Sequence, residues 1–108
     1  MNTMNEIIAE RKIFAISTDG QKNIFNIAIG KPYPVDDVSW ACPVKINGLH
    51  NKLKDVVGID SWQSLNLAIF LVQQLLGYYV EDGGKLYWEE DGETLSLKDL
   101  FPQFKSFI

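Results

Sequence analysis

The stretch DSWQSLNLAIFLVQQLLGYYV, residues 60–80, decides the fold because it is long and regular enough to form one helix. Its apolar residues recur at steps of three and four, the period of an amphipathic helix. Asp60 precedes the pattern and Gln63 follows three residues later, so a capping box is predicted at the helix start. The predicted buried stripe consists of Trp62, Leu65, Ile69, Val72, Leu76 and Tyr79. The polar side consists of Gln63, Asn66, Gln73, Gln74 and Gly77, and Phe70 falls among them, either covered by a loop or exposed for a partner.

Two strand patterns at the start of the chain predict a β-hairpin. The segment EIIAERKIFAIST is separated by Asp19-Gly20 from QKNIFNIAIG, in which Phe25, Ile27 and Ile29 alternate on one face. An Asp-Gly pair between two β-type runs is a strong hairpin signal, and it favours a type I′ turn. The segment KPYPVDD that follows is expected to break regular structure because it holds two prolines.

A third strand is predicted over VSWACPVKI, residues 38–46, just before a polar connection that precedes the helix. Its apolar face consists of Val38, Trp40, Cys42, Val44 and Ile46. Pro43 cannot donate a ladder hydrogen bond, so it predicts an edge strand or a bulge. The connection NGLHNKLKDVVG is polar and bounded by glycines, and it has room for a short helical turn.

After the helix, KLYWE predicts one more strand with Leu86 and Trp88 on one face, and EDGE predicts a turn. The last residues predict a short strand or coil and then a helical turn stopped by Pro102. The chain shows no repeat or linker, so residues 1–108 are expected to form a single domain. The predicted fold is α+β: an antiparallel sheet of about four to five strands in the order β-β-β-α-β, with one long helix packed on one face.

Composition narrows the classes of function. The 108 residues are 46% hydrophobic and 22% charged, which is typical of a globular protein. The net charge of −4 has the wrong sign for a nucleic-acid binder. A single cysteine rules out an internal disulfide, no signal peptide is recognised, and the longest pure apolar run, residues 67–72, is too short to span a membrane. A soluble cytoplasmic protein is expected.

The only cysteine and the only histidine, Cys42 and His50, are the first candidates for chemistry. Cys42 is predicted to lie in mid-strand on the apolar face, where desolvation raises the pKa of a thiol and makes it unreactive. His50 lies in a polar loop, where a solvated side chain is the expected state. Four Cys or His ligands for zinc are not available, and no nucleotide-binding glycine motif occurs. We therefore predict no catalytic residue, no cofactor and no metal.

The acidic C-terminal part is the most informative surface feature. Seven of the 14 acidic residues lie between Glu81 and Asp99, against only Lys85 and Lys98. Such a segment is either a solvated turn or a docking surface for a basic partner. The docking interpretation selects Tyr87, Glu89, Glu90, Asp91, Glu93 and Phe70.

A spaced pattern links the third strand to the start of the helix: Trp40-x-Cys42, Ile46-x-Gly48-Leu49 and Gly58-x-Asp60-Ser61-x-Gln63-x-Leu65-x-x-Ala68. It resembles an uncharacterised family of small bacterial proteins, a domain of unknown function. The resemblance covers about residues 11–97, and Ser64 stands where Ala is frequent in such sequences. It implies the fold and brings no catalytic residue with it.

Three hypotheses of function follow. The first is a protein–protein interaction module such as a bacterial immunity- or antitoxin-type inhibitor, with an acidic surface for a basic partner. The second is a small-molecule-binding protein or minor enzyme with a pocket between helix and sheet, using Cys42 or His50. The third is a structural homo-oligomer, formed through a sheet edge or through the Phe70 side of the helix.

Overall fold

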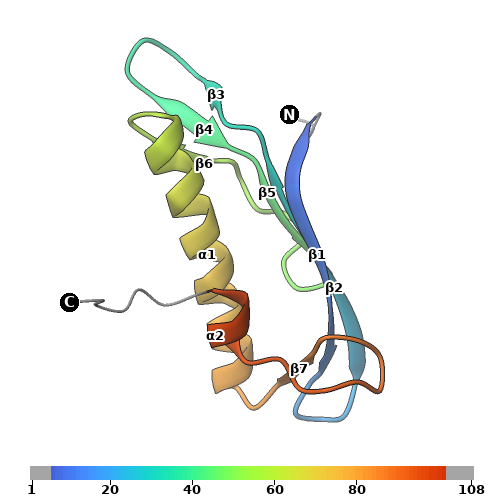
Figure 1. Cartoon of the computed structure of the whole chain (residues 1–108). Helices are drawn as coiled ribbons and strands as arrows, with labels where there is room; N and C mark the ends of the chain where they lie inside the picture. The colour runs from blue at the N-terminus through green and yellow to red at the C-terminus, as the bar shows by residue number, and fades with distance from the viewer. Residues whose placement is uncertain (1–5, 102–108) are drawn as a thin grey trace, which may run out of the picture.

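A computed structural model describes residues 6–101, which form two antiparallel sheets and one long helix (Figure 1). The first sheet has the strand order β5-β2-β1-β7 and the second has the order β3-β4-β6. The strands are β1 (Ile7–Ile16), β2 (Lys22–Gly30), β3 (Tyr33–Pro34), β4 (Trp40–Cys42), β5 (Val44–Asn47), β6 (Val56–Gly58) and β7 (Lys85–Tyr87); the helices are α1 (Ser61–Glu81) and α2 (Leu97–Leu100). The predicted α+β class is confirmed, with seven strands in two sheets in place of four or five in one.

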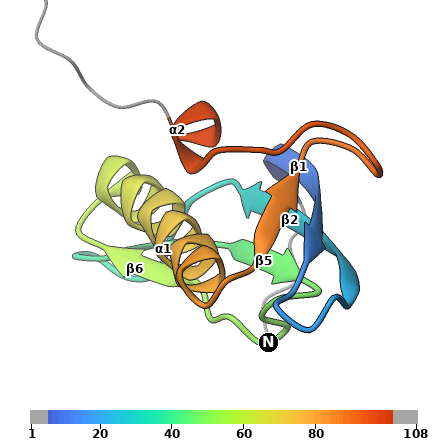
Figure 2. The same ribbon diagram turned by 90° about the horizontal axis from the view of Figure 1, so that it is seen from below.

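Helix α1 covers one face of the molecule, and α2 lies beside it (Figures 1 and 2). Helix α1 packs on β4 and β6 near its first residues, and on β2, β5 and β7 further along. Apolar side chains from both sheets meet the helix in one core, made up chiefly of Ile13, Ala15, Phe25, Ile27, Ile29, Cys42, Val44, Ile46, Ala68, Val72, Leu76 and Leu86. The helix therefore joins the two sheets into one layered structure.

The predicted hairpin is confirmed, and Phe25, Ile27 and Ile29 are buried as expected. The predicted turn type is wrong. The amide N–H of Ser17 donates to the Gln21 carbonyl at 2.9 Å, so the loop has three residues, and Gly20 has φ 86° whereas Asp19 does not have a positive φ. A three-residue loop that ends in a left-handed glycine accommodates the strand twist without placing Asp19 in that region.

The strand predicted over residues 38–46 is two strands in two different sheets. Val38 lies in the preceding loop and is 76% exposed, so its assignment to the apolar face was wrong. Pro43 separates β4 from β5, and its carbonyl accepts from the Gly30 amide N–H at 2.9 Å. Because proline breaks the ladder here, the chain passes from one sheet to the other, and all four residues 41–44 around the change are buried.

The connection before the helix also differs from expectation, because its end forms β6, which pairs with β4. Gly58 of this strand touches the helix so closely that a Cβ there would lie 2.7 Å from the Ser64 amide nitrogen. Small side chains must therefore face the sheet at the start of α1.

This contact explains why the predicted helix stripe is rotated from the observed one. The buried residues are Ser64, Ala68, Val72 and Leu76, spaced by four. Trp62 is 76% exposed and Ile69 is 39% exposed, so their assignment to the core was wrong. The large indole of Trp62 does not fit where the backbones of β6 and α1 meet.

The helix start itself agrees with the sequence. The Asp60 carboxylate accepts from the Gln63 amide N–H at 2.7 Å, and the Gln63 side chain accepts from the Ile59 amide N–H at 2.8 Å. The Gln63 amide thus reaches one residue further back than in a standard capping box. The predicted helical turn near the end is α2, with Ser96 as its N-cap, and Pro102 lies outside the described residues.

Candidate functional site

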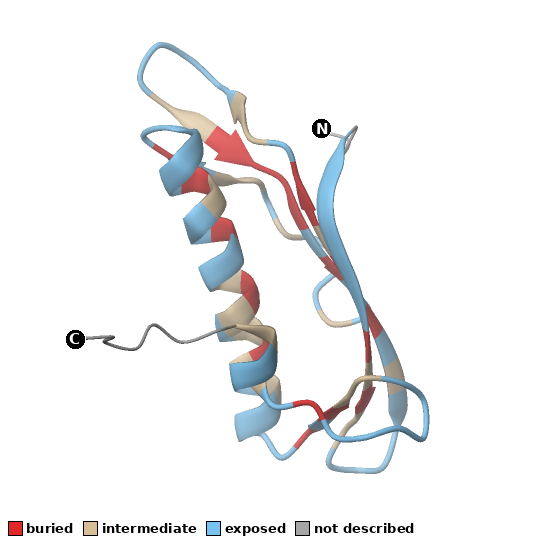
Figure 3. Cartoon of the chain, in the orientation of Figure 1, coloured by how far each residue is buried: buried red, intermediate tan, exposed pale blue. Residues whose placement is uncertain are grey.

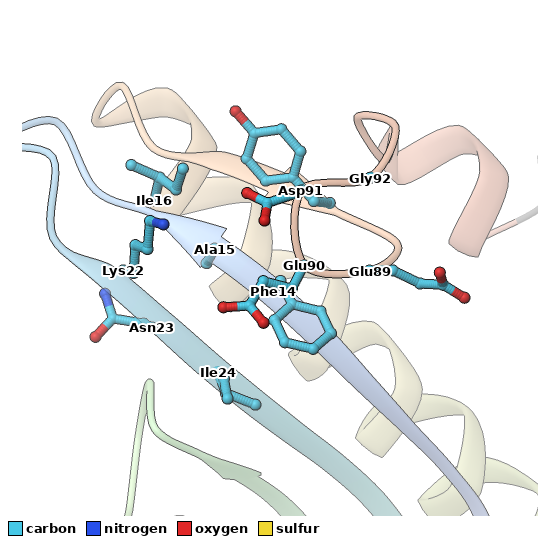
Figure 4. A pocket seen from close by; sticks show the side chains of 11 residues that line it. Phe14, Ala15, Ile16, Lys22, Asn23, Ile24, Glu89, Glu90, Asp91 and Gly92 are labelled. Carbon is cyan, nitrogen blue, oxygen red and sulfur yellow. The ribbon is translucent and has the colours of Figure 1, made fainter.

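A hollow of about 620 Å³ lies on the face of the four-stranded sheet that α1 does not cover (Figure 4). We call it the outer-face cavity. Three segments line it together with Tyr87: residues 14–16 of β1, residues 22–24 of β2, and residues 89–92 of the loop after β7.

Alternation along the strands supplies the apolar floor. Ile13 and Ala15 point into the core beneath α1, so Phe14 and Ile16 between them point to the other face. Ile24 on β2 pairs with Phe14 and is 48% exposed. Large apolar side chains thus stand on a sheet face that α1 does not cover.

A tight turn supplies the acidic rim. The Gly92 amide N–H donates to the Glu89 carbonyl at 2.9 Å, and Asp91 adopts the left-handed region at φ 58°. Figure 4 shows the carboxylates of Glu90 and Asp91 on the side of the turn that faces β1 and β2, whereas Glu89 extends away. Lys22 is the cation among the lining residues, so carboxylates outnumber ammonium groups at this cavity.

Arg11 contacts the residue that precedes the acidic turn. Its guanidinium lies 4.6 Å from the ring centroid of Trp88, the residue just before Glu89. Arg11 is exposed, and a cation–π contact at an exposed site stabilises the contacting pair by about 0.5–1 kcal/mol. The turn is closed further along by the Leu95 amide N–H, which donates to the Leu86 carbonyl at 2.8 Å.

A neighbouring hollow of about 700 Å³ on the same sheet has a mixed lining. It includes the carboxylates of Glu10 and Glu89 and the cations of Arg11, Lys12 and Lys45. Because both signs of charge line it, it favours neither cationic nor anionic ligands. The outer-face cavity, in contrast, is lined by three carboxylates and one ammonium group.

The structure brings together four of the six residues selected for docking. Tyr87, Glu89, Glu90 and Asp91 line the outer-face cavity, and Glu93 follows in the same loop without lining it. Phe70 lies on α1, which packs on the other face of the sheet, so it belongs to a different surface. The prediction missed Phe14, Lys22 and Ile24, although the unbroken apolar run at residues 13–16 is a signal that both faces of β1 carry apolar side chains.

Cys42 and His50 do not take part in this site. Cys42 is fully buried, and its thiol lies within hydrogen-bond distance of the carbonyl oxygens of Gly30 and Pro43. Burial, reinforced by the nearby Asp55 carboxylate, raises the pKa of the Cys42 thiol to about 11. His50 is exposed in the turn after β5. The prediction of a buried, desolvated thiol is confirmed.

Within residues 6–101, no three His, Cys, Asp or Glu side chains are grouped so that they could hold a metal ion. In the same part of the chain, no helix has the length and apolar character needed to cross a membrane.

The fold and site define a class: an α+β domain that presents an apolar hollow with an acidic rim. A protein-family model for a domain of unknown function (DUF6968) matches residues 9–98, and the chain belongs to this family. Comparison with curated proteins and with solved structures gives no match.

Proposed function

We propose that the protein is a protein–protein interaction module that captures a cationic segment of a partner in the outer-face cavity. The observation that carries the proposal is the combination of an apolar floor, formed by Phe14 and Ile24, with a carboxylate rim at Glu90 and Asp91.

Lysine and arginine have the chemistry that such a cavity recognises. Their apolar stems pack on hydrophobic surface while their charged ends stay at its edge. A stem on Phe14 and Ile24 places the charged end near the acidic turn, where charge-assisted hydrogen bonds are strong. Opposite potentials also speed the encounter.

A bacterial immunity- or antitoxin-type inhibitor that acts in the cytoplasm is one instance of such a module. It would use its net charge of −4 to cover a basic partner. This instance is supported by the size and charge of the chain and by its single cysteine.

The proposal is tested with a labelled peptide that carries lysine and arginine around one aromatic residue, followed by fluorescence anisotropy at low and high salt. Reversing Glu89, Glu90 and Asp91 to lysine should weaken binding at least about tenfold at low salt, because it removes the attraction and replaces it with repulsion.

The matched control reverses Glu6, Asp37 and Glu81 to lysine, three exposed residues outside the cavity lining, so the net charge changes equally. This control should keep most of the affinity. Equal binding by the cavity variant and the wild type would refute the proposal, and equal loss in both variants would show that net charge alone attracts the peptide.

A second candidate is a small-molecule-binding protein, because about 620 Å³ falls within the usual range of ligand pockets. A hollow that lies between α1 and the sheet is smaller, about 180 Å³, and neither Cys42 nor His50 lines it. A thermal-shift comparison of benzamidine with neutral benzamide tests this candidate. Stabilisation by the cation alone supports it, and equal or absent shifts count against it.

A further inference from the structure

The outward face of α1 carries no charged residue. From Ser61 to Val80 the helix contains no Asp, Glu, Lys, Arg or His, and Glu81 is its first charge. A surface helix of a globular protein normally turns charged or other polar side chains toward water, whereas α1 also exposes large apolar side chains such as Leu67, Phe70 and Tyr78. Figure 3 shows that residues on the side of α1 away from the sheets are exposed.

One stripe on this face has the spacing of a helix–helix seam. Steps of four, three, four and four residues place its members in a row along α1. We call it the outward stripe, and it consists of Gln63, Leu67, Phe70, Gln74 and Tyr78. Phe70 is 53% exposed and Tyr78 is 57% exposed, which is unusual for aromatic side chains on a folded chain.

We propose that the outward stripe is the interface between two copies of this chain, packed as an antiparallel pair of α1 helices around a two-fold axis. In this arrangement Phe70 meets Phe70 of the second copy. Leu67 lies opposite Gln74, and the amide of Gln63 lies opposite the Tyr78 hydroxyl, because these positions are equally far from the centre of the stripe.

The absence of charge on this face suits a second copy as the occupant. Two chains of net charge −4 repel each other over most of their surfaces, and the repulsion is smallest where the approaching faces are uncharged. A closed pair with two-fold symmetry requires a surface complementary to itself. The outward stripe meets this condition because it contains no charge, its central Phe70 faces Phe70, and the Gln63 amide faces the Tyr78 hydroxyl, with which it can form a hydrogen bond.

The available area fits a reversible dimer. With aromatic side chains of about 150–250 Å² each, the exposed parts of Phe70 and Tyr78 supply roughly 200 Å². Leu67, the two glutamines and the flanking residues bring the area to roughly 500 Å² per copy, so a pair buries about 1,000 Å², the lower bound for a specific interface. The apparent mass should therefore depend on protein concentration.

The test is sedimentation equilibrium of the full chain over about two decades of concentration. The wild type should pass from 12.3 kDa toward twice that mass as concentration rises. Phe70→Glu should remain at the mass of one chain, because it places two carboxylates at the axis, and the association constant should fall at least about a hundredfold. Circular dichroism confirms that the variant is folded.

Two further variants make the geometry testable. Trp62→Glu adds the same charge to an exposed apolar position about 100° around the helix from Gln63, so it should dimerise like the wild type. Phe70→Glu and Phe70→Lys should each be monomeric alone and form a heterodimer when mixed, since opposite charges then meet at the axis. A wild type that stays monomeric at every concentration overturns the proposal, as does a dimer that survives Phe70→Glu.

Discussion

Chemical labelling of Cys42 offers a direct test of how the core is built. Cys42 of β4 is fully buried in the core, and burial raises the pKa of its thiol from the ordinary 9.0 to about 11. This rise in the pKa lowers the fraction of Cys42 present as thiolate at neutral pH about a hundredfold, and the thiolate is the form that reacts. If instead the reagent reaches the thiol only when the domain opens, the thiol then has its ordinary pKa, and a stability of about 5 kcal/mol reduces the rate by a factor on the order of 10⁻⁴ relative to the unfolded chain.

The assay follows labelling by a chromogenic disulfide reagent at neutral pH, in buffer and in denaturant. The native chain should react at least about a hundredfold more slowly than the unfolded chain. A variant that combines Cys42→Ala with Thr18→Cys is the positive control, because residue 18 lies in the exposed hairpin loop. Labelling of native Cys42 as fast as the cysteine at position 18 would refute the burial argument and return the residue to the list of reactive groups.

Further predictions concern stability, measured by urea unfolding. Above about pH 9 the unfolded chain releases the Cys42 proton, whereas the native state keeps it up to about pH 11. The free energy of unfolding should therefore fall by up to about 3 kcal/mol between pH 9 and pH 11. Cys42→Ala should not show this loss. Asp60→Ala should cost about 1 kcal/mol because the Gln63 amide N–H loses its acceptor, and a smaller loss than a few tenths would contradict the cap. Gly58→Ala should cost about 1–3 kcal/mol because its Cβ would meet the Ser64 backbone at 2.7 Å. Gly77→Ala is the matched control: its Cβ has open space apart from a Leu97 methyl at 4.0 Å, so it should stabilise the helix by about 0.5–1 kcal/mol.

Much of the fold could be predicted from residues that are close together in the chain. The hairpin follows from alternation around Asp19-Gly20, and the start of α1 follows from Asp60, because both depend on residues close together in the chain. The rotation of α1 could not be predicted in this way. Apolar residues occur all round the helix, and the choice among its faces depends on Gly58, which brings β6 against Ser64.

The break at Pro43 illustrates the same limit. The alternation from Trp40 to Ile46 is continuous, yet the two halves pair with different strands. Only the distant partners, β2 for one half and β6 for the other, decide that the chain changes sheets. Proline identified the position of the change, but an edge, a bulge and a change of sheet leave the same local pattern.

The candidate site could also be predicted only in part from the sequence. Charge density in the sequence was enough to select the turn at residues 89–91, because those residues are neighbours in the chain. The apolar floor was missed because Phe14 and Ile24 meet only when β1 pairs with β2. Phe70 was grouped with the turn by its chemistry alone, and the fold separates them.

This separation has a consequence for binding if both proposals hold. The outer-face cavity and the outward stripe lie on opposite layers, so a pair joined through α1 leaves both cavities open. Such a dimer binds a surface that bears many copies of a basic peptide with avidity, whereas a single peptide in solution binds each cavity independently. Phe70→Glu should therefore leave the affinity for the free peptide unchanged and speed dissociation from a densely coated biosensor surface at least about tenfold. The Trp62→Glu control should dissociate like the wild type. Weaker binding of the free peptide by Phe70→Glu would show that the helix face and the cavity are not independent, and would contradict this arrangement.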